Sequence, residues 1–421
     1  MSLELINVRG KRCLPSWPLS GIDKMVESWA DYLLVYDYPL DVQAFATHLA
    51  SALDVNPYFA GRKQTTPQGL VATGDNQGVR LEISRHTLRL PLTVLQGDYR
   101  GLDPFCDRTW RERHRLSRTS LSQPLLQIRL SLFEDATVVG FSVWHGLSDG
   151  TTFFEFLACI AQFATARSEQ IDAPDFTPLD AVAGPMPGHA LVDRWQRPAH
   201  EQVLARFAEA AFTLTKENIE RLLGGCDYHG FMRDDLLISC IWRLIITTDI
   251  MPDQQDVVLY PVYDARLLMG VSAGRMGNLL CYPTVKVRAM LLREMSLPAI
   301  AGLVRQAVGE RVMDCETLHA ELQAICAVAD GAEKGRYLLS PLYESFFGNG
   351  VLFNNLTGMP CQRFDLGAGG PVHVDSPLHD PMRFVQFFPC LSGAGLMTVK
   401  VNLELEHLQR FKAAFLKELH V

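Results

Sequence analysis

The stretch from His145 to Gly150, which reads His-Gly-Leu-Ser-Asp-Gly, holds the side chains best suited to acid–base chemistry. A histidine titrates near neutral pH and can take a proton from an alcohol, an amine or a thiol. Asp149, four residues further along, could orient the imidazole ring by accepting a hydrogen bond, or could fix the turn. The same pattern also fits a solvent-facing turn with an incidental histidine, so the rest of the chain must decide.

The segments on either side of this motif are predicted to be a strand and a helix. Residues 125–133 and 137–144 flank a short Glu-Asp-Ala segment, which is typical of a β-hairpin that leads into the motif. Residues 151–166 carry aromatic and aliphatic side chains at helical spacing, which we interpret as a core face: Phe153, Phe156, Leu157, Ile160 and Phe163. His145 is therefore expected at the end of a strand, just before a helix.

Strands and helices are predicted in both halves of the chain. The apolar patterns indicate strands at 32–37, 78–83, 257–263, 351–353, 384–388 and 396–403. They indicate helices at 41–53, 215–223, 234–246, 297–312 and 405–419. This mixture predicts an α/β protein with its site in the cleft between two halves.

A break in the pattern separates the halves. Residues 170–200 are rich in proline, glycine and aspartate, which is typical of turns and linkers. We therefore place an N-terminal domain at 1–175, a crossover at 176–205 and a C-terminal domain at 206–421. In this division, part of 350–395 could pack with the N-terminal domain.

Composition restricts the class of protein. The chain has 421 residues, is 48% hydrophobic and carries a net charge of −8, so a general nucleic-acid or anionic-membrane surface is not expected. A local basic pocket for one anionic cofactor stays open. No apolar run approaches the ~18 residues of a membrane span, and the start does not resemble a signal peptide. Ten cysteines without a Cys-x-x-Cys pair indicate a reducing compartment, and we expect the cytoplasm.

Six motifs stand in order along the chain: Tyr58-Phe-Ala-Gly-Arg62, His145-x-x-x-Asp149-Gly150, Ser239-Cys-Ile-Trp-Arg243, Asp264-Ala-Arg266, Gly277-Asn278 and Asp365-Leu-Gly-Ala-Gly-Gly-Pro371. Together they resemble the motifs of the BAHD acyl-CoA-dependent acyltransferases, within the wider chloramphenicol-acetyltransferase and condensation-domain superfamily. The resemblance implies two chloramphenicol-acetyltransferase-like domains of mixed sheet plus helices, joined by a crossover loop. It also implies an active site in a channel between them.

The departures from the family pattern indicate a divergent member. Leu366 and Ala368 stand where the family has a phenylalanine and a tryptophan, and residues 354–356 read Asn-Asn-Leu where it has Thr-Ser-Trp. Trp144 precedes His145, so the tandem histidine of peptide-synthetase condensation domains is missing. That argues against a carrier-protein-dependent condensation enzyme without eliminating it.

The resemblance implies direct acyl transfer without an acyl-enzyme. His145 would be the general base that deprotonates the hydroxyl or amine of a small-molecule acceptor, which attacks the acyl-CoA thioester. Acyl-CoA is then a co-substrate, and no permanently bound cofactor is expected. Similar proteins are mostly monomers. Asp149 stands either as a second catalytic acid or, as the resemblance favours, as the structural ion-pair partner of Arg266.

Four further residues receive predicted roles. Asn354 is the candidate donor to the oxyanion of the tetrahedral intermediate, with a strand-end turn residue as the alternative. Asn278 and Asp365 are predicted to be structural. Arg233, beside the start of a helix, could meet a CoA phosphate or could be a solvated surface arginine.

Two other interpretations stay open. The residues His373, Asp375, His379 and Asp380 have types that bind metals, but no metal is predicted, because the resemblance places this region near the acceptor channel. The departures at 354–356 and at Ala368 also fit a non-catalytic binding protein on the same fold.

Overall fold

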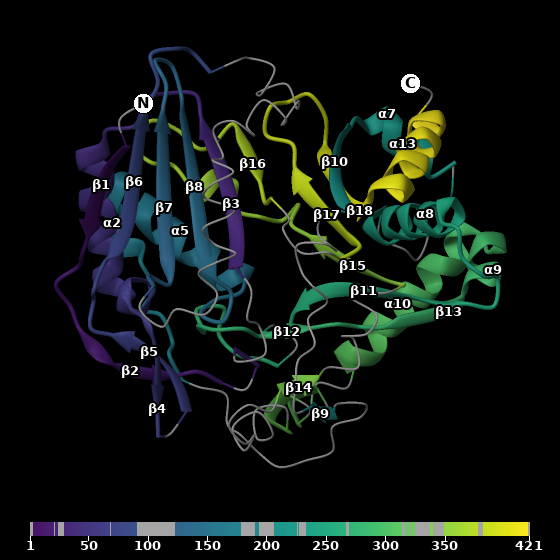
Figure 1. The fold of residues 1–421 in the computed structure, drawn as a ribbon, viewed down its shortest axis with the longest axis horizontal. Helices are drawn as coiled ribbons and strands as arrows, with labels where there is room; N and C mark the ends of the chain where they lie inside the picture. Colours follow the sequence, from purple (N-terminus) through teal and green to yellow (C-terminus); the bar gives the residue numbers. More distant parts are fainter. Residues whose placement is uncertain are drawn as a thin grey trace.

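Two large β-sheets lie side by side in the computed structural model, and helices cover one face of each (Figure 1). The N-terminal half forms most of one sheet and the C-terminal half forms the other. The structure describes residues 3–20, 22–23, 29–67, 69–90, 123–177, 190–192, 206–224, 226, 233–266, 269–313, 316, 318–320, 322–324, 337–339, 349–377 and 382–419.

The first sheet positions the His145 motif. Its strands lie in the order β1 (Leu3–Val8), β6 (Val79–Arg85), β7 (Leu126–Leu132), β8 (Thr137–Trp144), β3 (Trp29–Tyr36) and β16 (His373–Asp375). The predicted hairpin is confirmed, since β7 and β8 pair antiparallel from Leu132↔Thr137 to Leu126↔Val143. Helices α2 (Val42–Val55) and α5 (Gly150–Ala164) pack against this sheet around a common apolar core.

The second sheet carries most of the C-terminal helices. Its strand order is β10 (Phe207–Leu214), β18 (Met397–Glu404), β17 (Phe384–Pro389), β15 (Gly350–Asn355), β11 (Asp256–Asp264) and β12 (Leu280–Cys281), with β13 (Val285–Arg288) also paired to β11. Its apolar face packs on α7 (Lys216–Leu222), α8 (Arg233–Thr248), α9 (Ala289–Glu294), α10 (Leu297–Met313) and α13 (Leu405–Leu419). No helix in the described part of the chain is long and apolar enough to cross a bilayer.

Smaller elements complete the fold. Strands β2 (Leu14–Pro18), β5 (Gly69–Gly74) and β4 (Lys63–Thr66) form a three-stranded sheet, and β9 (Ala190–Val192) pairs with β14 (Tyr337–Leu339). Single 3₁₀ turns occur at η1 (Pro57–Ala60), η4 (Ser168–Gln170) and η5 (Cys361–Arg363).

Sequence periodicity located the longer elements and missed two strands that matter here. The alanine-rich segment of β10 favours a helix by local propensity, yet it pairs with β18 along its whole length, so tertiary pairing decides its structure. Strand β16 has three residues, too few for a periodic signal. The domain boundaries stay a prediction, because most of 176–205 lies outside the described residues.

A buried ion cluster joins the two sheets. β16 pairs with β3 of the first sheet, while Lys400 projects from β18 of the second. The Nζ atom of Lys400 lies 2.8 Å from Asp375 Oδ1 and 3.0 Å from Glu209 Oε2, and the lysine side chain is 5% exposed. Burial alone would raise the pKa of the Asp375 carboxyl, but the charges of Lys400 and His373 and the hydrogen bonds from Lys400 and Ser376 together hold that pKa below its usual range.

We expect Lys400→Met to lower the free energy of unfolding by about 3–5 kcal/mol, because the carboxylate of Asp375, whose side chain is 13% exposed, loses its cation. Urea denaturation measures the loss. Lys286→Met is the matched control. Its pair with Asp256 at 3.0 Å involves a side chain that is 63% exposed, so the change should stay below about 1 kcal/mol. Equal losses of stability in the two variants would contradict a larger contribution from the buried cluster.

Candidate active site

His145 is the first residue of the tight turn between β8 and α5. Backbone hydrogen bonds from Leu147 N to Trp144 O (2.9 Å) and from Ser148 N to His145 O (3.2 Å) close this turn. Helix α5 then begins at Gly150, where the Asp149 side chain accepts a hydrogen bond from Thr152 N at 3.0 Å. A strand end, a turn and a capped helix therefore place the imidazole, as the sequence pattern predicts.

Gly146 is required by a close approach within the turn. The indole of Trp144 folds over it, and a Cβ at position 146 would lie 2.3 to 2.7 Å from three ring atoms. Trp144 is 1% exposed and fully packed, so the ring has no free space to enter. Any larger residue here must shift either the core or the backbone that carries His145.

The hydrogen bonds of Asn278 determine which nitrogen of His145 carries the proton. Its Nδ2 donates to His145 O at 2.7 Å and to Asp23 Oδ1 at 3.0 Å, and both of these atoms only accept. Nδ2 and Oδ1 are therefore assigned by the network. Oδ1 then faces His145 Nδ1 at 3.0 Å, so Nδ1 must donate. In the neutral ring the lone pair is on Nε2, the atom left to act as a base.

Asp23 holds the other side of Asn278. Its Oδ1 accepts from Asn278 N at 2.8 Å, and its Oδ2 accepts from Ser20 N and Oγ at 2.9 and 2.7 Å. Burial raises the pKa of the Asp23 carboxyl, while the bonds from Ser20 and Asn278 act in the opposite direction. Sequence reasoning missed this residue. Its only local signal is the Ser-x-x-Asp spacing of a capping box, since Asp23 N also donates to Ser20 Oγ at 3.2 Å.

Asp149 and Arg266 form a buried ion pair. The Arg266 Nη1 atom lies 2.7 Å from Asp149 Oδ2, and Nη2 donates to Asp149 Oδ1 at 3.2 Å. The arginine side chain is 2% exposed and the aspartate is fully covered. Burial alone would lower the pKa of the guanidinium, but Asp149 and then Asp264 raise it above its usual range. The Asp149 carboxylate thus accepts hydrogen bonds from Arg266, from Thr152 N at the start of the helix and from Leu279 N at 3.0 Å.

Asp264 extends this network to α5. Thr151 Oγ1 donates to Asp264 Oδ2 at 2.6 Å, and Arg266 Nη1 donates to Asp264 Oδ1 at 3.0 Å. Arg266 Nη2 also donates to Thr152 Oγ1 at 3.0 Å and to Gly277 O at 2.8 Å. The network joins α5 of the first half to the end of β11 and the loop before β12 in the second half.

Asn354 lies on β15, in register with Val262 of β11 and Gln386 of β17. Its neighbour Phe353 is in the core, so Asn354 projects from the opposite face of the sheet. This is the face of Val262 and Asp264 on the adjacent strand. The amide of Asn354 makes no hydrogen bond within the described residues, whereas Asn355 Nδ2 donates to Asp234 Oδ2 at 2.8 Å.

Asp365 and Arg233 have local contacts. Asp365 Oδ1 accepts from Gly367 N and Gly369 N, both at 2.8 Å, and so folds a loop in which these two glycines have φ of +114° and +125°. Arg233 is the first residue of α8, with its Nε 3.7 Å from Asp234 Oδ1. The first turn of α8 thus already carries carboxylates, and a phosphate contact for Arg233 stays a prediction.

Two of the four candidate metal ligands, His373 and Asp375, lie on β16 within the described residues. Burial lowers the pKa of His373 to about 4, and Asp375 is bound to Lys400. His379 and Asp380 lie outside the described residues. Within the part of the chain that the structure describes, three His, Cys, Asp or Glu side chains nowhere gather as a metal site would require.

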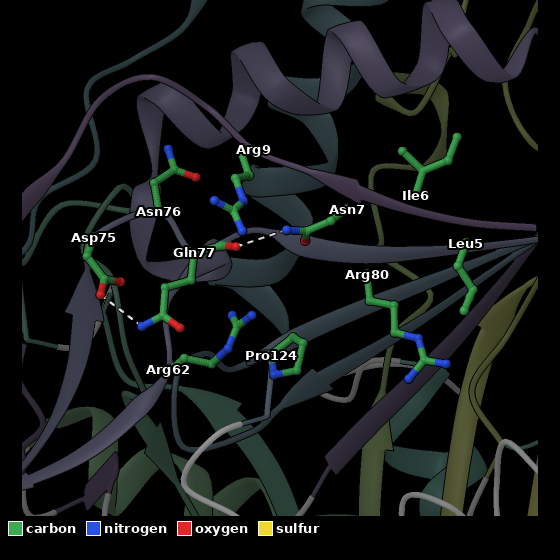
Figure 2. Close-up of a pocket in the computed structure, with 10 residues that line it drawn as sticks. All are labelled: Leu5, Ile6, Asn7, Arg9, Arg62, Asp75, Asn76, Gln77, Arg80 and Pro124. Carbon is green, nitrogen blue, oxygen red and sulfur yellow. Dashed lines mark hydrogen bonds between the residues drawn. The ribbon is translucent and has the colours of Figure 1, made fainter.

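A separate open hollow of about 510 Å³ lies along β1 and β6. Figure 2 shows Arg9, Arg62 and Arg80 around it, with Gln77 bonded to both Asp75 and Asn7. Arg62 is held there by three backbone carbonyls, those of residues 60, 61 and 78. None of the predicted site residues lines this hollow.

Known proteins resemble the chain over most of its length. No family model matches it. An anthranilate N-benzoyltransferase from Dianthus caryophyllus is 24% identical over 348 residues, which is 76% of this chain and 74% of that protein. Rosmarinate synthase from Plectranthus scutellarioides is 23% identical over 414 residues, which is 90% and 92% of the two chains.

The fold agrees with this likeness. The structure of F. graminearum TRI101 complexed with coenzyme A and deoxynivalenol superposes with a TM-score of 0.73 at 15% identity, covering 95% of this chain and 97% of that chain. These similarities confirm the resemblance to the BAHD acyltransferases and their two-domain α/β fold.

We expect Asp149→Ala to lower the free energy of unfolding by about 3–5 kcal/mol, because Arg266 is left as a buried charge without its main partner. Chemical denaturation measures the loss. Glu155→Ala is the control on the same helix, since its pair with Arg363 is 42% exposed on both sides and should be worth less than about 1 kcal/mol. A stable Asp149→Ala protein would show that the ion pair does not support the turn.

Gly146→Ala tests the packing of the turn. We expect a loss of about 1–3 kcal/mol in stability from overpacking against Trp144, together with lower activity because His145 moves. The control is Gly309→Ala in α10, where a Cβ meets nothing within 4 Å and helix propensity predicts a gain of up to about 1 kcal/mol. The expected result is a lower unfolding temperature for Gly146→Ala and a higher one for Gly309→Ala. A shift of Gly146→Ala to higher temperature contradicts the close approach.

Proposed function

We propose that the protein is an acyltransferase that moves an acyl group from an acyl-CoA thioester to the hydroxyl or amine of a small-molecule acceptor in specialised metabolism. The observation that carries the proposal is the state of His145. Its Nδ1 is engaged by the Asn278 amide oxygen at 3.0 Å, so the lone pair of the neutral ring is on Nε2. A base in this state fits an alcohol or amine nucleophile.

The reaction then follows in two steps. As the acceptor oxygen or nitrogen attacks the thioester carbonyl carbon, His145 Nε2 takes its proton and a tetrahedral intermediate forms. The C–S bond breaks, the carbonyl re-forms, and the CoA thiolate takes the proton back from the imidazolium. Asp149 takes no proton in this scheme, because Arg266, Thr152 N and Leu279 N already occupy its oxygens. We assign it to the structure of the turn.

The oxyanion needs a hydrogen-bond donor in place of the family's threonine and tryptophan. Asn354 is our candidate, because its amide projects from the face of the second sheet that also carries Asp264. Asp264 in turn contacts Thr151 on α5, six residues beyond His145. Leu356 has no side-chain donor, and Asn355 is bonded to Asp234.

Acyl-CoA as the donor is supported by the coenzyme A complex of TRI101, which shares this fold. The proposal includes no permanently bound cofactor, a monomeric state by likeness to the family, and a cytoplasmic location from the cysteine usage. Arg233 remains the candidate contact to a CoA phosphate, and Asn278 and Asp365 the structural supports. We also propose the domain division at 1–175, 176–205 and 206–421.

The test is release of free CoA thiol from acetyl-, malonyl- and longer acyl-CoA esters with a panel of alcohols and amines. We expect His145→Ala to lower the rate of release by about 10²–10⁴-fold, the usual contribution of a general base. His48→Ala on α2 is the matched histidine control and should keep the wild-type rate.

Three outcomes would contradict the proposal. Release of CoA thiol by His145→Ala at the wild-type rate would contradict the mechanism. Turnover with an acylated carrier protein but with no CoA ester favours the condensation-type reaction. Biological activity that survives in His145→Ala favours a non-catalytic binding protein on the same fold.

A further inference from the structure

Hydrogen bonds join three side chains in series, from Asp23 through Asn278 to His145. Asp23 is 2% exposed, and both of its carboxylate oxygens accept two hydrogen bonds. Two of the four come from Asn278, through its backbone N and its Nδ2. Asp23 and Asn278 are 255 residues apart in the chain, so the contact exists only in the folded protein.

The contact is built at close range. Gly277, just before Asn278, has φ of +92°, and a Cβ there would lie 3.1 Å from Asp23 Oδ1 and 3.2 Å from the Trp17 ring. A glycine is therefore needed both for the backbone conformation and for the approach of the carboxylate. On the following residue, Leu279 N donates to Asp149 at 3.0 Å. Two buried carboxylates thus hold two successive residues of the same loop.

The two carboxylates act on different parts of that loop. Asp149 receives a backbone N–H, whereas Asp23 also receives the side-chain amide that touches the imidazole. With Asp23 present, Asn278 Nδ2 has two acceptors, Asp23 Oδ1 and His145 O. A flipped amide would set Oδ1 against both acceptors and would offer Nδ2 to His145 Nδ1, which favours a ring with its proton on Nε2.

We propose that Asp23 is a positioning residue for His145: it fixes the amide orientation of Asn278 and thereby the Nδ1–H tautomer of the imidazole. The role matters because the neutral ring of a free histidine prefers its proton on Nε2, where it blocks the atom that must act as base. The link to catalysis rests on the proposed function, but the tautomer itself is a property of the protein without substrate.

The experiment is a long-range ¹H–¹⁵N spectrum of protein labelled with ¹⁵N-histidine, with the His145 signals identified by their absence from His145→Gln. Nitrogen shifts distinguish a protonated ring nitrogen from one with a lone pair. The variants are Asp23→Ala and Asp23→Asn. The control is Asp54→Ala, which also removes a carboxylate that accepts from two backbone N–H groups, those of Lys11 and Arg12.

The wild type and Asp54→Ala should show His145 with a protonated Nδ1. Asp23→Ala should show the two nitrogen shifts moving toward each other, as in a tautomer mixture, with kcat lower by about tenfold or more and KM for acyl-CoA unchanged. Asp23→Asn should recover part of both effects, since its amide oxygen can still accept from Asn278 Nδ2.

The proposal is overturned if the wild type carries its proton on Nε2, a result that needs no folded variant. It is also overturned if Asp23→Ala folds and keeps the wild-type nitrogen shifts. A protonated Nδ1 that depends on Asp23, in a protein that turns over no acyl donor, would instead leave this inference standing and remove the proposed function.

Discussion

The buried guanidinium of Arg266 is the interaction on which the rest of the site depends. Its charge is removed from water at 2% exposure, which is tolerable only if every N–H finds an acceptor. The acceptors come from both halves of the protein. Asp149 and Thr152 lie at the start of α5, while Asp264 and the carbonyls of residues 275 and 277 belong to the second half. Satisfying one arginine therefore fixes how the two sheets meet.

That constraint explains the division of labour around His145. Asp149 sits four residues after the histidine, yet its oxygens are filled by structural contacts. The imidazole is oriented by Asn278. This residue lies in the same loop, directly before Leu279, whose backbone N donates to Asp149. Because the imidazole is already oriented, little free energy is needed to reorient it when the acceptor binds. The Lys400 cluster adds a second buried joint between the sheets, on the strands β18 and β16.

The sequence predicted the local structure of this site well, because the pattern that encodes it is local. The hairpin, the strand end at Trp144 and the apolar face of α5 follow from periodicity within about thirty residues. The pairing of Asp149 with Arg266 needed the family resemblance, since 117 residues separate them. Asp23 and Lys400 were out of reach, because polar residues carry no periodic signal and their partners are set by the packing of the two sheets. Likewise, Asn278 could be predicted as a turn residue, but its contact with the imidazole could not.

A crystal structure with coenzyme A and an unreactive acceptor analogue tests the central claim most directly. The claim is that the fold presents His145 Nε2, and not Nδ1 or Asp149, to the reacting atoms. The account predicts the sulfur of CoA beside His145, with the acceptor oxygen or nitrogen within about 3–3.5 Å of Nε2, and Asn278 still bound to Nδ1. Coenzyme A bound with its thiol away from His145, or an acceptor held against Asp149, would contradict it.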